Sequence, residues 1–175
     1  MCFPAATPDR TCINVRPSRV ARYCAVRRLV RPYEVAALIP RSRFPTLPAW
    51  LWVTRTGAWL QSRFREGTLA YFADPDVTID QWCSPAATLG RGGGDCDDLA
   101  ILATSLLVAA GVDAYVVVGE AFNGWRWDGH AWVEGADEHG GFLLEATSGR
   151  IARGWRPAWY RAEAFLPHDP FRLVD

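Results

Sequence analysis

The chain has 175 residues, of which 50% are hydrophobic and 22% charged. This is an ordinary globular composition at a length that favours a single domain, and it excludes collagen-like, mucin-like and wholly disordered chains. The 19 basic and 19 acidic residues cancel, so net charge does not indicate a nucleic-acid or anionic-membrane partner. Because no signal peptide or membrane-spanning stretch is recognisable, we expect a cytoplasmic protein without a membrane partner.

The charges are unevenly distributed along the chain. Residues 1–65 contain 12 Arg and two acids, whereas residues 66–175 contain 7 Arg and 17 acids. Packing of the two parts against each other accounts for this pattern, and a basic arm that contacts an acidic partner or a nucleic acid is the alternative. We expect residues 1–48 to form a basic N-terminal arm, loosely ordered or helical, and residues 49–175 to form the folded domain.

Five cysteines stand at positions 2, 12, 24, 83 and 96. The odd number and the absence of a C-x-x-C pair argue against a disulfide framework and against a zinc ribbon. At least one thiol is therefore expected to be free.

The first half of the chain contains two predicted helices. The spacing of its aromatic and leucine residues predicts a helix over 49–64, with Gly67 as its stop. Residues 69–72 read as a short extended piece. Residues 81–89 read as a turn followed by a short helix, with Ser84 as N-cap and a proline at its first position. The glycine-rich residues 90–94 then predict an open loop.

A strong helix is predicted over residues 97–110, because acids open it and Gly111 follows it. Its apolar residues run almost all round, so it should be central and buried. Strands are predicted at 115–118, 130–134 and 142–146, joined by glycine-containing turns that favour an antiparallel meander. The aromatic tail, residues 150–175, is expected to wrap the core. The pattern as a whole predicts an α+β fold.

Cys96 has the position of a reactive thiol, because it precedes the buried helix and a helix N-terminus favours the thiolate. His130, at the start of the second strand, can supply an imidazolium. Glu145, near the end of the third, can orient that imidazole from across the hairpin. A cysteine at a helix start with a histidine and a carboxylate on adjoining strands is the arrangement of a Cys-His-acid triad.

Three segments together resemble the transglutaminase-like superfamily, a branch of the papain-like cysteine enzymes. They are Gly93-Gly94-Asp95-Cys96-Asp97-Asp98, Gly129-His130-Ala131-Trp132-Val133 and Leu144-Glu145-Ala146-Thr147. The resemblance covers about residues 70–150. Within the superfamily, this stretch is similar to bacterial and phage members of the cysteine proteinase type. It implies a papain-like, transglutaminase-like core in which a central helix bearing the cysteine packs on an antiparallel β-sheet.

The resemblance also implies roles for individual residues. Cys96 is then the nucleophile, His130 the general base and acid, and Glu145 the orienting group, where many members have Asp. The backbone N–H of Cys96 and a group from Gln81 or Trp82 are the candidate oxyanion donors. Candidate residues of the substrate cleft are the aromatic and glycine residues that flank the motifs, namely Trp125, Trp127, Gly93 and Gly94.

Asp95, Asp97 and Asp98 place three carboxylates around the cysteine. Helix capping and dipole stabilisation are the simplest explanation. A calcium site is the alternative, because a group of bacterial relatives has acids at the matching positions and calcium prefers carboxylate oxygens. Three uncompensated acids would raise the pKa of the thiol, so a metal, an Arg or His130 is expected to offset them. Calcium is the one cofactor considered, and none is required by the predicted chemistry.

These observations favour a cysteine peptidase or amidase that cleaves protein or peptide amides through a thioester. A protein-glutamine transglutaminase is the first alternative, because an amine can accept the acyl group in place of water. A non-catalytic binding or assembly module that keeps the triad is the second.

Overall fold

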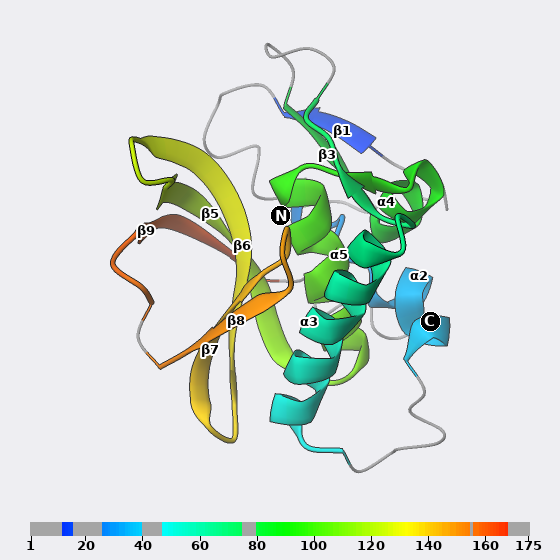
Figure 1. Cartoon of the computed structure of the whole chain (residues 1–175). Helices are drawn as coiled ribbons and strands as arrows, with labels where there is room; N and C mark the ends of the chain where they lie inside the picture. The colour runs from blue at the N-terminus through cyan, green and yellow to red at the C-terminus, as the bar shows by residue number, and fades with distance from the viewer. Residues whose placement is uncertain (1–11, 16–25, 40–46, 75–79, 155, 168–175) are drawn as a thin grey trace, which may run out of the picture.

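The computed structural model describes residues 12–15, 26–39, 47–74, 80–154 and 156–167 (Figure 1). In chain order its elements are β1 (Cys12–Val15), α2 (Pro32–Val35), the 3-10 helix η1 (Ala36–Leu38), α3 (Ala49–Arg65), β2 (Ala70–Tyr71), β3 (Asp80–Cys83), α4 (Pro85–Arg91), β4 (Gly93–Gly94), α5 (Cys96–Ala109), β5 (Asp113–Phe122), β6 (Trp127–Asp137), β7 (Gly140–Glu145), β8 (Arg150–Arg153) and β9 (Tyr160–Pro167). Helices gather on one side of a five-stranded sheet, which confirms the α+β prediction (Figure 1). Within these ranges, helices fall short of the length and apolarity that a membrane crossing requires.

The sheet has the strand order β8-β7-β6-β5-β9, and each neighbouring pair is antiparallel. The predicted meander is therefore present as β5, β6 and β7. The tail, which was expected to wrap the core, also contributes two strands that the sequence did not predict, because β8 and β9 occupy the two opposite edges of the sheet. Alternation over 150–153 and 160–167 is short and partly interrupted, which is why periodicity alone did not reveal these strands.

Helix α5 is the centre of the core, as predicted. Leu99, Ile101, Leu102 and Leu107 are fully buried, and the helix packs against β5 and β6 on one side and α2, α3 and α4 on others. Its mostly apolar circumference leaves no polar face for solvent, so it can be stable only when surrounded.

Local signals fix helix α4, which precedes the glycine-rich segment. The Ser84 side chain accepts the N–H of Ala87, as expected of an N-cap. Gly92 ends the helix in the left-handed conformation with φ +77°. The predicted open loop was wrong, since Gly93 and Gly94 are buried and pair with β2 in parallel. A Cβ on Gly93 would lie 1.9 Å from the Ala70 carbonyl oxygen.

The described part of the basic N-terminal arm packs on this core. Val26, Leu29 and Val35 are buried in the same hydrophobic cluster as α5. The backbone N–H of Arg31 donates to the Ser105 hydroxyl at 2.9 Å, which ties α2 to α5. Packing of the two oppositely charged parts, the first of the two sequence-based explanations, is therefore seen over residues 26–39; the boundary at 48 stays a prediction.

Strand β1 extends this N-terminal contact to β3. The two strands pair in antiparallel register with Cys12 opposite Cys83, and these cysteines form a disulfide. The sequence argued against a disulfide framework and did not reveal this single disulfide, because 71 residues separate the partners and only tertiary pairing of the strands brings them together. Within the described ranges, Cys96 is the one free cysteine, as the odd count required.

Helix α3 approaches the turn after β7 through two glycines. A Cβ on Gly57 would lie 2.7 Å from the Gly149 carbonyl oxygen and 3.1 Å from the Ile151 side chain. Gly149 itself has φ +68°, and its carbonyl accepts the Gln61 side-chain amide at 3.1 Å. The turn that follows Glu145 is thus held directly against α3.

We expect Gly57→Ala to destabilise the protein by about 1–3 kcal/mol, because the new methyl overpacks this contact. The sign is diagnostic, since the same change in a free helix stabilises by about 1 kcal/mol. Denaturant unfolding would measure the effect, with Thr54→Ala, on the exposed face of α3, as the control. A Gly57→Ala variant at least as stable as wild type would contradict the close approach.

Candidate active site

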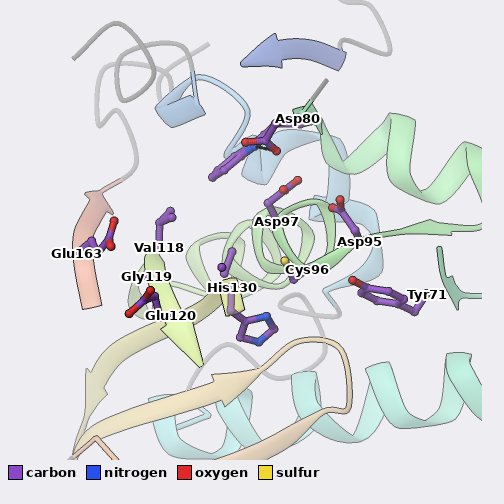
Figure 2. Close-up of a pocket in the computed structure, with 13 residues that line it drawn as sticks. Tyr71, Asp80, Asp95, Cys96, Asp97, Val118, Gly119, Glu120, His130 and Glu163 are labelled. Atoms are coloured by element: carbon purple, nitrogen blue, oxygen red, sulfur yellow. Dashed lines mark hydrogen bonds between the residues drawn. The ribbon is translucent and has the colours of Figure 1, made fainter. Parts of the chain in front are cut away.

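A cavity of about 490 Å³ opens where the start of α5 meets the sheet (Figure 2). Cys96 of α5 and His130 of β6 both line it. Residues of β2, β3, β5 and β9 complete the lining in the described part of the chain. Elements distant in sequence thus enclose the two residues that the motif pattern singled out.

Cys96 is the first residue of α5 and is largely buried. Burial raises the pKa of its thiol well above the ordinary value, and the charges of Asp97 and Asp95 raise it further. A backbone hydrogen bond from Ala131 on β6 acts in the opposite direction. The ladder between β6 and β7 ends at Val133, so the sulfur meets β6 beyond that pairing, next to His130 in the chain.

His130 and Glu145 form a direct pair. The imidazole Nε2 lies 2.7 Å from Glu145 Oε2, and their side chains are only 19% and 12% exposed. The last paired residues of β6 and β7 are Val133 and Leu144, so the two side chains meet diagonally just past the end of the ladder. Because Nε2 is paired with Glu145, Nδ1 is the ring nitrogen that can exchange a proton with a thiol or a substrate.

Glu145 is held by three further donors. Thr147 donates its backbone N–H at 3.1 Å and its hydroxyl at 2.7 Å to Oε1, and the Tyr160 hydroxyl donates to Oε2 at 2.8 Å. Burial alone would raise the pKa of Glu145, but the hydrogen bond and charge of His130, with Thr147 and Tyr160, lower it below its ordinary value. Glu145 is therefore an ionised, fixed carboxylate.

Tyr160 was missed from the sequence. It lies on β9, at the sheet edge assigned only to a wrapping tail, and no motif marks it. Its ring packs edge-on against Trp132 at a centroid distance of 5.1 Å. Burial and the adjacent Glu145 raise the pKa of its hydroxyl, which keeps it a hydrogen-bond donor. Thr147, by contrast, belongs to the third motif and could have been proposed as a partner of Glu145.

Asp95, Asp97 and Asp98 come together as the first turn of α5 folds. One ligand atom from each lies within 4.8 Å of the others. Burial raises the pKa of all three carboxyls, and the charge of Asp95 adds to the shift of Asp97 and of Asp98, whose pKa rises to about 7. An oxygen of each is buried without a hydrogen-bond partner among the described residues.

Capping accounts for only part of this cluster. The Asp95 side chain makes no capping hydrogen bond to α5, and Asp98 instead accepts the backbone N–H of Cys83 at 2.6 Å. Arg91 lies 3.6 Å from Asp98 and offsets part of the charge. Three buried carboxylates with spare oxygens are a donor set that suits a hard divalent cation such as calcium. The residues present therefore fit such an ion.

The two candidate oxyanion donors on β3, Gln81 and Trp82, differ in whether they line the cavity. Trp82 lines the cavity, and its indole N–H donates to Asp80 at 2.6 Å. Gln81 is not among the lining residues; its amide donates to Asn14 of β1 at 3.3 Å. Because successive strand residues point to opposite faces, Trp82 is the one of these two candidates that lines the cavity, on the same face of β3 as Asp80.

The four substrate-cleft candidates lie outside the cavity lining. Trp125 is 93% exposed in the turn between β5 and β6. Trp127 packs against Phe122 at 5.5 Å and under the Arg161 guanidinium at 3.8 Å. Gly93 and Gly94 are buried in the β2–β4 pair, which determines how the chain enters α5. The sequence placed these residues near the motifs, but twist and strand pairing direct them elsewhere.

Comparison with known proteins is consistent with this geometry. The family profile described as "CEP76 peptidase-like domain" matches residues 80–166, which contain every element from β3 to β9. Centrosomal protein of 76 kDa from Xenopus tropicalis and from Homo sapiens are each 46% identical over 54 residues. This stretch is 31% of the chain and only 8% of either relative, so the chain spans a small part of their length.

Solved structures show the same fold. Legionella pneumophila LapG in its calcium-bound form superposes with a TM-score of 0.54 at 17% identity, over 81% of this chain and 70% of that one. The EGTA-treated form of LapG gives a TM-score of 0.53 at 18% identity, over 81% and 68% of the two chains. The chain has the α+β fold of LapG, and its residues 80–166 match the CEP76 peptidase-like domain.

Proposed function

We propose that the protein is a cysteine peptidase that cleaves protein or peptide amides through a thioester at Cys96. The observation that carries the proposal is the shared cavity: a cysteine at a buried helix start and a histidine held by a buried carboxylate line one opening. This is the arrangement that lets an imidazole move a thiol proton onto a leaving amine.

The reaction follows from the contacts of these residues. His130 takes the proton of Cys96 as the sulfur attacks the amide carbonyl. The C–N bond then breaks, and the imidazolium returns the proton to the departing amine. Water adds to the thioester with His130 again as base, and releases the acid and the thiol. Glu145 keeps the ring orientation and stabilises its cation through both steps.

The helix start supplies the complementary charge. The backbone N–H of Cys96, at the first turn of α5, can donate to the carbonyl oxygen as negative charge develops there. Trp82 borders the same cavity and excludes water from one side of it. The core fixes the Cys96 backbone N–H and the Trp82 side chain in place. The N–H is therefore a preorganised donor, and Trp82 is a fixed wall of the cavity.

A transglutaminase would use the same thioester with an amine as acceptor. A non-catalytic module is the other alternative, since the curated relatives are named as centrosomal proteins. The buried donors around Glu145 favour catalysis, because a structural role would not need an ionised carboxylate on the imidazole.

The test is reaction of the full chain with an electrophilic peptide probe, followed by mass mapping of the labelled residue. If the protein is a peptidase, the peptide probe should label Cys96 faster than a small thiol reagent does. The protein should also release free acids from a peptide library. Products that carry an added primary amine would identify a transferase. Absence of labelling at Cys96 in the folded protein would overturn the enzyme proposal.

We further propose that Asp95, Asp97 and Asp98 hold calcium. The unpartnered buried oxygens support it, as does the structural similarity to LapG in its calcium-bound form. A bound divalent cation supplies charge neutralisation next to Cys96. The charges of Asp97 and Asp95 raise the pKa of the Cys96 thiol. A bound cation would offset these charges and so favour the thiolate.

Calcium at about 100 times its dissociation constant should stabilise the protein by about 2.7 kcal/mol, which raises the melting temperature by roughly 5–10 °C for a domain of this size. Thermal melts in calcium and in chelator measure the shift. Asp97→Asn should abolish it, whereas Asp113→Asn, an exposed acid at the start of β5, should leave it unchanged. Equal melting temperatures in calcium and chelator would remove the calcium proposal.

A further inference from the structure

Two glutamates line the end of the cavity that lies farthest from Tyr71 and Asp95. Glu120 stands on β5 and Glu163 on β9, and both border the same opening as Cys96. Figure 2 shows them on one side of Cys96 and His130, with Tyr71 and Asp95 on the other. We call Glu120 and Glu163 the acidic end of the cavity.

Strand geometry places each glutamate differently. Glu120 is two residues beyond Val118, which packs on the α5 core and also lines the cavity, so alternation directs Glu120 to the same face. Glu163 stands at a bulge: Val118 pairs with Ala164 and Gly119 with Ala162, which leaves Glu163 as the extra residue. Alternation from Ala162, on the outer face, directs Glu163 to the cavity side, and the bulge places the next residue, Ala164, on that side as well.

The hydrophobic contacts trace this change of face along β9. Before the bulge, Tyr160 and Ala162 pack against the outer cluster of Val117 and Trp132. After it, Ala164 and Leu166 pack on the α5 side. Gly119 is required there, because a Cβ would lie 1.9 Å from the Arg161 carbonyl oxygen.

The acidic end has no countercharge in the described part of the chain. Neither Glu120 nor Glu163 makes an ion pair or a side-chain hydrogen bond there, whereas Arg161 lies over Trp127 instead. The described lining carries five acids and no Arg. Asp97, in the same lining, is 5% exposed, and one of its oxygens has no hydrogen-bond partner among the described residues. A concave, acid-lined cavity concentrates negative potential and attracts cations.

The candidate calcium cluster does not account for the acidic end. The cluster that could hold a metal among the described residues consists of Asp95, Asp97 and Asp98, all from the start of α5. Glu120 and Glu163 come from two strands on the other side of Cys96. Calcium at the three aspartates would leave both glutamates charged and unpaired.

We propose that Glu120 and Glu163 bind a positively charged side chain, Arg or Lys, of the peptide whose amide Cys96 attacks. The inference rests on the proposed function and adds the substrate class: peptides with a basic residue close to the scissile bond. A guanidinium or ammonium can donate hydrogen bonds to both carboxylates while its stem lies along Val118.

The experiment compares electrophilic peptide probes that differ in one side chain. Each carries Arg, norleucine or Glu at one of the four positions nearest the reactive group, and the labelling rate of Cys96 is measured in calcium. At one position the Arg probe should react roughly tenfold faster than norleucine and the Glu probe more slowly, with the preference reduced by salt. Glu120→Gln with Glu163→Gln should remove the preference, measured as the ratio of the Arg rate to the norleucine rate within the same variant.

Asp113→Asn makes the same charge change at the other end of β5 and should keep the preference. The single variants Glu120→Gln and Glu163→Gln should each reduce it, which provides the measurement if the double variant does not fold. Equal rates for Arg and norleucine at all positions, or a preference that survives both substitutions, would overturn the inference and leave the peptidase proposal standing. Failure of every probe to label Cys96 would overturn both.

Discussion

Cys96→Ala should eliminate peptide cleavage, with a loss of about 10⁴-fold or more in kcat and no covalent labelling of the protein by electrophilic peptides. The reason is chemical: within the described ranges Cys96 is the one free thiol, and the cavity offers His130 no other nucleophile to deprotonate in the same position. Cleavage of a peptide substrate identified by library screening, followed by mass spectrometry, measures the loss.

The substitution should leave the fold intact. Alanine fits the first turn of a helix and removes a group whose ionisation the site opposes, so the melting temperature should not fall by more than a few degrees. Cys96→Ser tests the nucleophile more finely, because it keeps the size and loses the reactivity. A Cys96→Ala protein that folds and cleaves at the wild-type rate would assign the activity to another site.

Glu145→Gln should reduce kcat by about 10²- to 10⁴-fold while the protein remains folded. Gln has the shape of Glu but cannot accept at both ends, so two donors, either both from Thr147 or those from His130 and Tyr160, would face an NH₂ group. The imidazole would lose its fixed tautomer and the charge that stabilises its cation. Steady-state kinetics separate this loss in kcat from any change in KM.

Tyr160→Phe is the matched comparison, because it removes a single donor to Glu145 and keeps the charge. It should cost much less than Glu145→Gln, about tenfold or below, as expected for one hydrogen bond to a charged group. A Gln variant with the kcat of wild type would show that the carboxylate does not serve the histidine.

Acid unfolding gives an independent measure of Glu145. Its pKa is lower in the folded protein than in an unfolded chain, so its contribution to stability is complete above the unfolded pKa and is lost as the pH falls through the folded one. Glu145→Gln should lack that acid-dependent part. Parallel pH profiles of wild type and variant would contradict the lowered pKa.

Local sequence signals were sufficient for the elements with strong periodicity and caps. The helix over 49–65, the Ser84 cap, the buried helix that begins at Cys96 and the three-stranded meander all follow from spacing and turn residues. The order Cys96, His130, Glu145 within three motifs also pointed to the family and the fold. These features depend on neighbours in sequence, which is the range over which helix caps, hairpin turns and alternation act.

Long-range pairing decided the rest. The Cys12–Cys83 disulfide, the edge strands β8 and β9, the burial of Gly93 and the position of Tyr160 each need two distant segments to meet. The bulge at Glu163 is of the same kind, since a bulge exists only relative to the strand it opposes.

The sequence by itself determined which residues we propose for the chemistry, because a cysteine at a helix start and a histidine and acid on adjoining strands follow from local order along the chain. Only the tertiary structure decided what surrounds them: which donors hold Glu145, which tryptophan borders the cavity and which acids are left without a partner. The physical reason is that burial, hydrogen-bond partners and electrostatic potential are properties of packed segments, and packing joins residues that the chain keeps far apart.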